Sequence, residues 1–306
     1  MRSAILLLPL TLALGGCAAF SDDAGDGDAD GVAAAFYPLA YATERVAGGL
    51  VEVETLAQPG VEPHDLELSI KETALIADAA LVVYQEHFQP AVDDAIQQNA
   101  RGEVLDVSEA ADLITFESQH EHEAGEEEHG HSHEGEDPHF WLDPVRLADV
   151  GDAIADALAD LDPDHADDYA DNADALRADL EDLDAAYTSR LADCDRHTIV
   201  VSHDAFGYLG KYGIHVAPIA GLSPDAEPTP SDLAALQNLI DSEGITTVFS
   251  ERLAPPQLTE TLADDAGVRT AVLDPIEGLT DDTADEDYLS LMEHNLAALE
   301  KANGCR

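Results

Sequence analysis

Three histidines and one aspartate of this 306-residue sequence stand at positions where they could bind a metal ion together. His64, His203 and Asp274 each follow a predicted strand, and ligands of open α/β sheets bind at the carboxyl ends of strands. His139 follows a long loop, in the segment 137–144 that holds the only tryptophan. Three imidazoles and a carboxylate suit Zn²⁺, which takes four ligands tetrahedrally. The sequence therefore predicts a zinc site at these four residues.

The fourth ligand stays open at this stage, because Glu62, Glu251 or a water molecule could replace Asp274. Any one of the three histidines alone would more often be structural or on the surface, but their recurrence where strand ends should converge favours a shared site. Neighbouring carboxylates such as Asp65 and Asp204 could orient the rings. A zinc hydrolase is a rival hypothesis for the same ligands. Nothing in the sequence resembles HExxH or a nucleophile elbow.

A low-complexity segment over residues 118–137 holds five further histidines among many glutamates. They are His120, His122, His129, His131 and His133. They could form a low-affinity loop that collects metal and passes it inward. The alternative is a disordered, solvated insert without a required role. The other histidines carry no motif and are expected to be structural or on the surface: His87, His165, His197, His215 and His294.

Short apolar runs alternate with helical patterns in both halves of the chain. The first half predicts strands at 32–37, 51–55, 81–84 and 104–107, with helices at 39–48, 70–80 and 89–100. The second predicts strands at 198–201, 216–219, 246–249 and 270–273, with helices from 205 and at 231–243, 256–266 and 287–301. This alternation indicates parallel βαβ units. The predicted fold class is α/β, with two lobes of parallel sheet flanked by helices.

A helical region over 145–192 separates the two halves. From residue 163 onward an apolar stripe recurs at steps of three, four and seven residues, which is the period of a helix packed against a core. Its members are Tyr169, Leu176, Leu180, Leu183, Tyr187 and Leu191. One long, rigid helix is therefore expected to join an N-terminal lobe over 32–144 to a C-terminal lobe over 193–306.

The first 31 residues predict export and a lipid anchor. The apolar run after Arg2 is too short to span a bilayer and is typical of a signal peptide, here 1–16. The segment 14–17 resembles the bacterial lipobox, whose cysteine, here Cys17, is lipidated; an ordinary signal peptide with an incidental cysteine is the alternative. Residues 17–31 would then include a flexible acidic tether. These features predict a lipoprotein on the outer face of the cell membrane.

Acidic residues number 65 against 13 basic ones, which gives a net charge of −52. So few cations argue against a nucleic-acid partner, and the acidic residues are expected to form a solvated surface, of a kind that high salt would favour. Cys194 and Cys305 remain after the lipobox. In an exported chain such a pair usually forms a disulfide, and two buried free thiols are the alternative.

Four motifs resemble those of the zinc/manganese class of ABC-transporter solute-binding lipoproteins, and most closely its ZnuA-type, zinc-specific members. They are PHDLE at 63–67, HFWLDP at 139–144, SHDAFGY at 202–208 and LDP at 273–275. The resemblance covers about 32–301 and implies a metal site between two lobes bridged by one long helix. It implies that His64, His139 and His203 are ligands and that Asp274 is the fourth. It also implies a monomer that is not an enzyme and that delivers Zn²⁺ to an ABC permease and its ATPase.

His203 discriminates between the metals of this class. Manganese-type relatives tend to carry Glu at this position, because a more oxygen-rich shell suits manganese and a third imidazole suits zinc. The resemblance therefore implies zinc. A manganese-binding homologue, or a zinc-storage or adhesin surface lipoprotein, is the alternative.

Overall fold

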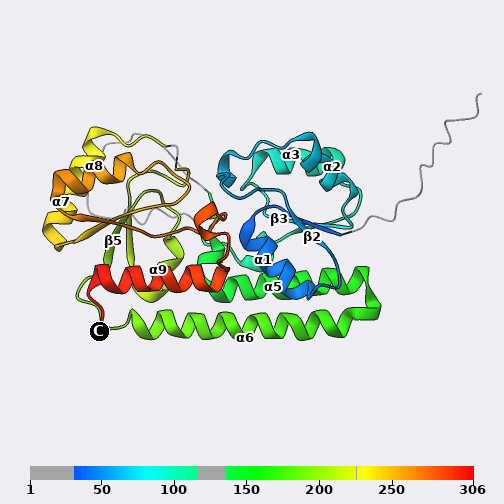
Figure 1. Ribbon diagram of the computed structural model, residues 1–306. Helices are drawn as coiled ribbons and strands as arrows, with labels where there is room; N and C mark the ends of the chain where they lie inside the picture. Colours follow the sequence, from blue (N-terminus) through cyan, green and yellow to red (C-terminus); the bar gives the residue numbers. More distant parts are fainter. Residues whose placement is uncertain (1–30, 116–134, 225) are drawn as a thin grey trace, which may run out of the picture.

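The computed structural model describes residues 31–115, 135–224 and 226–306, and Figure 1 shows two lobes above a pair of long helices. The first lobe holds a four-stranded parallel sheet in the order β2-β1-β3-β4. Its strands are β1 (Val32–Ala34), β2 (Val53–Thr55), β3 (Leu81–Tyr84) and β4 (Glu103–Asp106). The helices of this lobe are α1 (Tyr37–Ala47), α2 (Ile70–Asp78), α3 (Pro90–Asn99) and the short α4 (Ser108–Ala111).

The second lobe repeats this arrangement with the order β6-β5-β7-β8, again parallel. Its strands are β5 (Thr198–Val201), β6 (His215–Pro218), β7 (Thr247–Ser250) and β8 (Arg269–Val272). Its helices are α7 (Pro230–Glu243), α8 (Gln257–Ala266) and α9 (Tyr288–Asn303). The predicted α/β fold class is confirmed. In both sheets the chain reverses its winding after the second strand, and ligands gather at such a switch point.

Two expected elements differ from the structure. The strand expected at 32–37 ends at Ala34, because α1 begins at Tyr37 with Pro38 in its first turn, where proline is tolerated best. The helix expected from residue 205 is a short 3₁₀ helix, η4 (Gly207–Tyr212). It stops at Gly213, whose φ of 76° is a left-handed conformation that suits glycine.

The helical region between the lobes is an antiparallel pair, α5 (Pro144–Leu161) and α6 (Ala166–Arg190), joined by the short η3 (Pro163–His165). The 25 residues of α6 give a length of about 37 Å, and Figure 1 shows it running beneath both lobes. Asn172 Nδ2 donates to the Val46 carbonyl of α1 at 3.0 Å, and the Tyr187 hydroxyl donates to the Met292 carbonyl of α9 at 2.7 Å. One helix is therefore fastened to both lobes.

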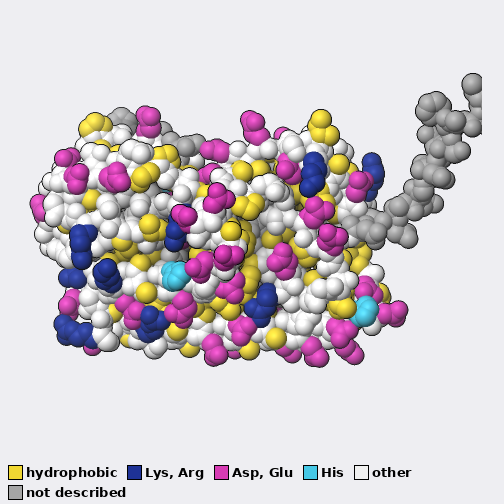
Figure 2. Space-filling model, in the orientation of Figure 1, with side chains coloured by type: hydrophobic (Ala, Val, Ile, Leu, Met, Phe, Trp, Pro, Cys, Tyr) yellow, Lys and Arg dark blue, Asp and Glu magenta, His cyan; other side chains and the backbone are white. Residues whose placement is uncertain are grey.

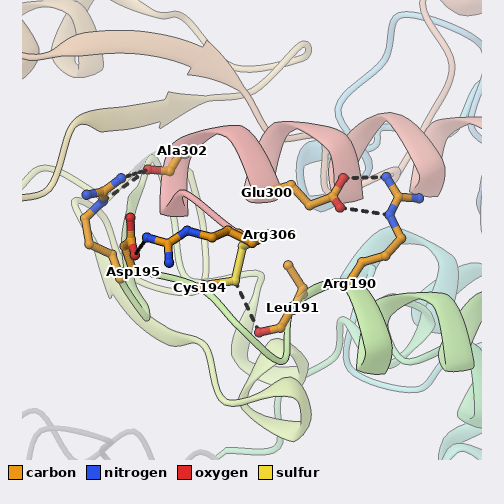
Figure 3. Close-up of a disulfide and its surroundings, with 9 residues drawn as sticks. Arg190, Leu191, Cys194, Asp195, Glu300, Ala302 and Arg306 are labelled. Carbon is orange, nitrogen blue, oxygen red and sulfur yellow. Dashed lines mark hydrogen bonds and ion pairs between the residues drawn. A yellow bond between two sulfur atoms is a disulfide. The ribbon is translucent and has the colours of Figure 1, made fainter.

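The C-terminus is tied to the end of α6, as Figure 3 shows. Cys194 and Cys305 form a disulfide. Arg190 donates from Nε to Glu300 of α9 at 3.0 Å, and Arg306 pairs with Asp195 at 2.7 Å. The disulfide closes a chain separation of 111 residues, and restricting the unfolded chain in this way contributes about 4–5 kcal/mol of stability.

One apolar core continues from the first lobe through the linking helices into the second. Its fully buried members include Leu39 of α1, Leu176 of α6, Phe249 of β7 and Leu296 of α9. A smaller core lies between the second sheet and helices α7 and α8. Because close-packed cores resist deformation, only small relative movements of the lobes are expected at their junction.

Acidic side chains are spread over the face of the molecule in Figure 2, as the composition predicts. Among the described residues, no helix is long and apolar enough to cross a membrane. The predicted signal peptide, the lipidation site Cys17 and the five histidines of the loop all lie outside the described residues.

Candidate metal centre

Four side chains from four separate segments converge where the lobes meet. They are His64, His139, His203 and Glu277, whose potential ligand atoms all lie within 4.8 Å of one another. His139 and His203 have no exposed surface, Glu277 is 1% exposed, and His64 is the least buried of the four. The first two come from the N-terminal lobe and the last two from the C-terminal lobe.

Short turns after strands place three of these side chains. His64 lies in the 3₁₀ helix η1 (Pro63–Asp65), which follows β2 and is capped by the Glu62 carboxylate accepting from the Asp65 N–H at 3.1 Å. His203 stands two residues beyond the end of β5, and Glu277 follows β8. Strand ends therefore deliver side chains to the junction, as expected for parallel sheets.

His139 is placed by a different route. It directly precedes the 3₁₀ helix η2 (Phe140–Leu142), which leads into α5. The Asp143 carboxylate accepts from the Val145 N–H at 3.1 Å and so caps the start of α5. The compact sequence from 137 to 144 thus fixes one potential ligand against the linking helices.

The distances within the cluster match a tetrahedral metal shell. Oε1 of Glu277 lies 3.4 Å from Nε2 of His64, 3.2 Å from Nε2 of His139 and 3.5 Å from Nε2 of His203. The Nε2 atoms of His64 and His139 are 3.4 Å apart. Metal–ligand bonds of about 2.0–2.1 Å give a tetrahedron with edges of about 3.3–3.4 Å. These atoms therefore stand at the spacing that four zinc ligands require.

Two atoms of the cluster are buried without a hydrogen-bond partner among the described residues: Nε2 of His203 and Oε1 of Glu277. They lie 3.5 Å apart, but their geometry does not make a hydrogen bond. Buried polar atoms are nearly always satisfied, and leaving one unpaired costs stability. A cation at the centre of the cluster would satisfy both atoms, so the residues fit a metal ion.

Carboxylates behind two of the rings fix their orientation. Nδ1 of His139 lies 2.8 Å from Oδ1 of Asp137, and Nδ1 of His203 lies 2.6 Å from Oε1 of Glu251. The Ser202 hydroxyl donates to the same Glu251 oxygen. With Nδ1 engaged in each case, Nε2 is turned towards the cluster, which is the usual arrangement for metal-binding histidine.

These orienting roles were not assigned by the sequence analysis. Asp65 and Asp204 were expected there because they adjoin His64 and His203 in sequence, whereas Asp137 and Glu251 perform the role for His139 and His203. Asp137 opens the segment 137–144, two residues before His139, so its position gave a usable signal. Glu251, at the end of β7, was considered only as a possible fourth ligand.

The cluster strongly favours positive charge. Burial alone would lower the pKa of His203, but its hydrogen bond with Glu251 and the negative charges of Glu251 and Glu277 raise the pKa to about 10. Burial would likewise lower the pKa of His139, but Asp137 and Glu277 outweigh burial and raise this pKa. Burial would raise the pKa of Glu277, but the three imidazoles hold it well below its usual range. Protons and a metal cation therefore compete for the same place.

A further carboxyl group lies beside this cluster. Burial, followed by the charge of Glu277, raises the pKa of Glu62 to about 8, and its Oε1 is buried without a hydrogen-bond partner. Among the described residues, Glu62 is not part of the close cluster.

Asp274 does not join the four residues, which corrects the expectation of Asp274 as the fourth ligand. Its Oδ2 lies 2.8 Å from Nε of Arg252, and its Oδ1 accepts from the Ile276 N–H at 2.9 Å. The site is reached only three residues later, by Glu277. The expectation that ligands follow strand ends identified the correct loop after β8. Asp274, which lies nearest the strand end, instead accepts a hydrogen bond from the backbone of this loop.

Two α/β lobes that share a core and enclose a buried group of three imidazoles and one carboxylate define a two-lobed metal-binding protein. The chain belongs to the family ZnuA, described as zinc-uptake complex component A periplasmic, whose model matches residues 32–302. The resemblance noted from the motifs is confirmed.

The chain is similar to proteins named for zinc. It is 37% identical over 309 residues to the zinc-binding lipoprotein AdcA of Streptococcus pneumoniae R6, covering 98% of this chain and 61% of AdcA. It therefore spans about three-fifths of the length of that relative. It is 34% identical to the high-affinity zinc uptake system protein ZnuA of Bacillus subtilis, covering 89% of this chain and 87% of that protein.

A solved structure with zinc bound has a similar fold. The Zn(II)-bound ZnuA-like domain of Streptococcus pneumoniae AdcA matches with a TM-score of 0.73 and 33% identity, covering 90% of this chain and 98% of that one. The part of AdcA that this chain resembles is therefore a domain solved with zinc bound.

Proposed function

We propose that this protein is the extracytoplasmic solute-binding component of an ABC transporter that captures Zn²⁺ between its lobes and delivers it to a permease served by an ATPase. The observation that carries the proposal is the close cluster of His64, His139, His203 and Glu277, whose ligand atoms all lie within 4.8 Å, with Glu277 Oε1 3.2–3.5 Å from the three Nε2 atoms. Membership of the ZnuA family and the zinc-bound relative add support.

The choice of zinc follows from the donor set. Three imidazole nitrogens and one carboxylate oxygen suit zinc, whereas manganese favours a shell richer in oxygen. Glu277 supplies one negative charge directly, and Asp137 and Glu251 strengthen the basicity of the rings that they contact. A manganese-binding homologue would be expected to present fewer nitrogens at this point.

Capture accounts for the site better than catalysis does. Catalytic zinc keeps a coordination position open for water or substrate, but here four protein groups are available as ligands for one ion. His139, His203 and Glu277 are essentially inaccessible, and only His64 keeps some exposure. We propose that the ion enters and leaves beside His64. A storage or adhesin lipoprotein acting through the histidine-rich loop would leave this enclosed site without a role.

The remaining features belong to the same proposal. A monomer attached by a lipid at Cys17 to the outer face of the cell membrane would keep the ion close to its permease. Because α6 is fastened to both lobes, closure around the ion would be a small tilt. Release would then require the permease to separate side chains that come from different lobes.

Metal analysis and competitive titration of the purified protein test this function. We expect one tightly bound zinc per chain. H203E should lower the preference for zinc over manganese at least tenfold, which is about 1.4 kcal/mol. H165E is the matched control, because His165 pairs with Asp168 on the surface at 3.0 Å. Absence of tight zinc binding by the unmodified protein, or an equal loss in H165E, would refute the proposal.

A further inference from the structure

The residue that precedes Glu277 has an unusual backbone conformation. Ile276 has a φ of 59°, in the left-handed region that L residues rarely adopt and that is a true outlier for a β-branched residue. Its side chain is completely buried. Such a conformation persists only where surrounding contacts impose it. The contacts around Ile276 must therefore hold its left-handed conformation, and the direction of the next residue, Glu277, depends on that conformation.

Asp274 makes the contact that fixes this turn. Its Oδ1 accepts the backbone N–H of Ile276 at 2.9 Å, while Oδ2 is held by Nε of Arg252 at 2.8 Å. The backbone of Asp274 is held in turn by Asn295 of α9. Asn295 Oδ1 accepts the Asp274 N–H at 2.8 Å, and its Nδ2 donates to the Asp274 carbonyl at 2.6 Å. Asp274 and Asn295 are each only 5% exposed.

The same loop is also fastened from the other lobe. Trp141, two residues beyond His139, donates from Nε1 to the Pro275 carbonyl at 2.7 Å. The loop 274–277 is therefore bound on both sides, and its one strained residue lies between the last of these contacts and Glu277. Relaxation of φ at Ile276 would rotate the whole of Glu277. A zinc ligand tolerates displacements of only about 0.2 Å.

Resting on the proposed zinc site, we propose that Asp274 is a positioning residue that holds Ile276 in its left-handed conformation and thereby directs the Glu277 carboxylate at the three imidazoles. Asp274 thus contributes to zinc affinity without touching the ion. The bond that matters is the one from the Ile276 N–H to Oδ1. The ion pair with Arg252 keeps the Asp274 carboxylate in place.

Variants of Asp274 test this role by zinc titration. D274A removes the acceptor and should weaken zinc binding at least tenfold. D274N keeps an oxygen that can accept the Ile276 N–H but loses the ion pair with Arg252, so its zinc affinity should lie between those of D274A and the unmodified protein. D274E keeps the charge but displaces the oxygen by one methylene, so its zinc affinity should be as low as that of D274A. D274E is the variant to use if D274A does not fold.

A pair of variants at Ile276 separates positioning from general stabilisation. Glycine adopts positive φ without strain, whereas alanine does not, and the two differ by a single methyl group. In an I276G background, D274A should cost less than threefold in zinc affinity, because the turn no longer needs to be imposed. In an I276A background, the same change should keep its full, at least tenfold effect.

The visible spectrum of bound Co²⁺ supplies a readout that a merely structural role would not move. D274A should reproduce the altered spectrum of E277Q, and D274N should depart less from the spectrum of the unmodified protein. Thermal unfolding of each metal-free variant reports folding separately. Unchanged zinc affinity and cobalt spectrum in D274A and D274E, or an equal loss in both Ile276 backgrounds, would overturn the inference. If the proposed function itself fails, the unmodified protein shows no tight zinc binding at all.

Discussion

A single carboxylate oxygen of Asp137 binds His139 twice, accepting its backbone N–H at 3.0 Å and lying 2.8 Å from its ring Nδ1. Both residues are almost completely buried. The backbone and the ring of His139, a proposed metal ligand, are therefore both fixed by the Asp137 carboxylate.

Replacement of Asp137 by alanine should weaken zinc binding by about 10–100-fold, the usual effect of removing a carboxylate that orients a ligating histidine. Competition with a chelating dye measures the change. D168A is the matched control, because it breaks the exposed contact of Asp168 with His165. Equal affinities in D137A and the unmodified protein would show that Asp137 does not support the site.

Replacement of Gly207 by alanine should also weaken zinc binding, through the same carboxylate. A Cβ atom at Gly207 would lie 2.6 Å from Oδ2 of Asp137, which cannot move freely while it holds His139. G221A is the control, because the nearest atom to its added Cβ lies at an ordinary 3.9 Å. We expect several-fold weaker zinc binding for G207A and unchanged zinc binding for G221A. Similar affinities in the two variants would contradict the prediction.

Zinc affinity should rise with pH. In the metal-free protein, His203 has a pKa of about 10 and the pKa of His139 is also raised, so zinc must displace protons. Each displaced proton changes the apparent affinity about tenfold per pH unit. From pH 8 to pH 6 we expect a fall of at least about 100-fold, measured by titration in metal-free buffers. A constant affinity over this range would exclude binding by these imidazoles.

The metal-free protein should show the opposite trend in stability. Because folding raises the pKa of His203 above its ordinary 6.5, this group contributes stability that is complete below that value and is lost as pH rises towards about 10. Chemical denaturation at several pH values measures this loss. H203Q, which cannot titrate, should remove much of the decline.

Zinc should raise the unfolding temperature of the purified protein. A free zinc concentration 100 times the dissociation constant adds about 2.7 kcal/mol, which is about 4–5 °C for a chain of this size. A chelator should reverse the shift. A variant lacking His139 and His203 is the control and should not respond. An equal shift in that variant would place the zinc elsewhere on the protein.

Deletion of residues 119–135 should leave the affinity of the central site unchanged. Thr115 and Glu136 form an antiparallel bridge, and the Asp137 N–H donates to the Ile114 carbonyl at 2.9 Å, so described residues before and after this segment already lie together. Zinc uptake by cells under scarcity should fall if the loop histidines collect metal. Unaffected uptake would reject the collecting role.

The strands and the three histidines could be predicted from sequence because their signals are local. The strands β3 and β5 match the expected bounds residue for residue, since Leu81–Tyr84 and Thr198–Val201 are short apolar runs beside turns or helices. The three histidines stand in compact motifs with recognisable neighbours. Features of this kind depend on residues that are close in sequence, so the sequence alone can predict them.

Glu277 could not be predicted in the same way. It is one of 65 acidic residues, and nothing in its neighbours marks it as a ligand. Its position depends on the left-handed turn at Ile276, which in turn depends on contacts with Asn295 and Trp141 from distant parts of the chain. Tertiary contacts of this kind leave no periodic pattern in the sequence, so the fourth group was assigned to Asp274.

Trp141 is the only tryptophan of the chain, and its ring centroid lies 5.4 Å from that of His139. Its indole bonds to Pro275 of the opposite lobe, and its carbonyl accepts from the Tyr288 hydroxyl. All indole fluorescence of the molecule therefore originates at the junction where the ion would bind. Emission from the unlabelled protein can follow ion arrival in real time, and a change in its wavelength would report separation of the two halves.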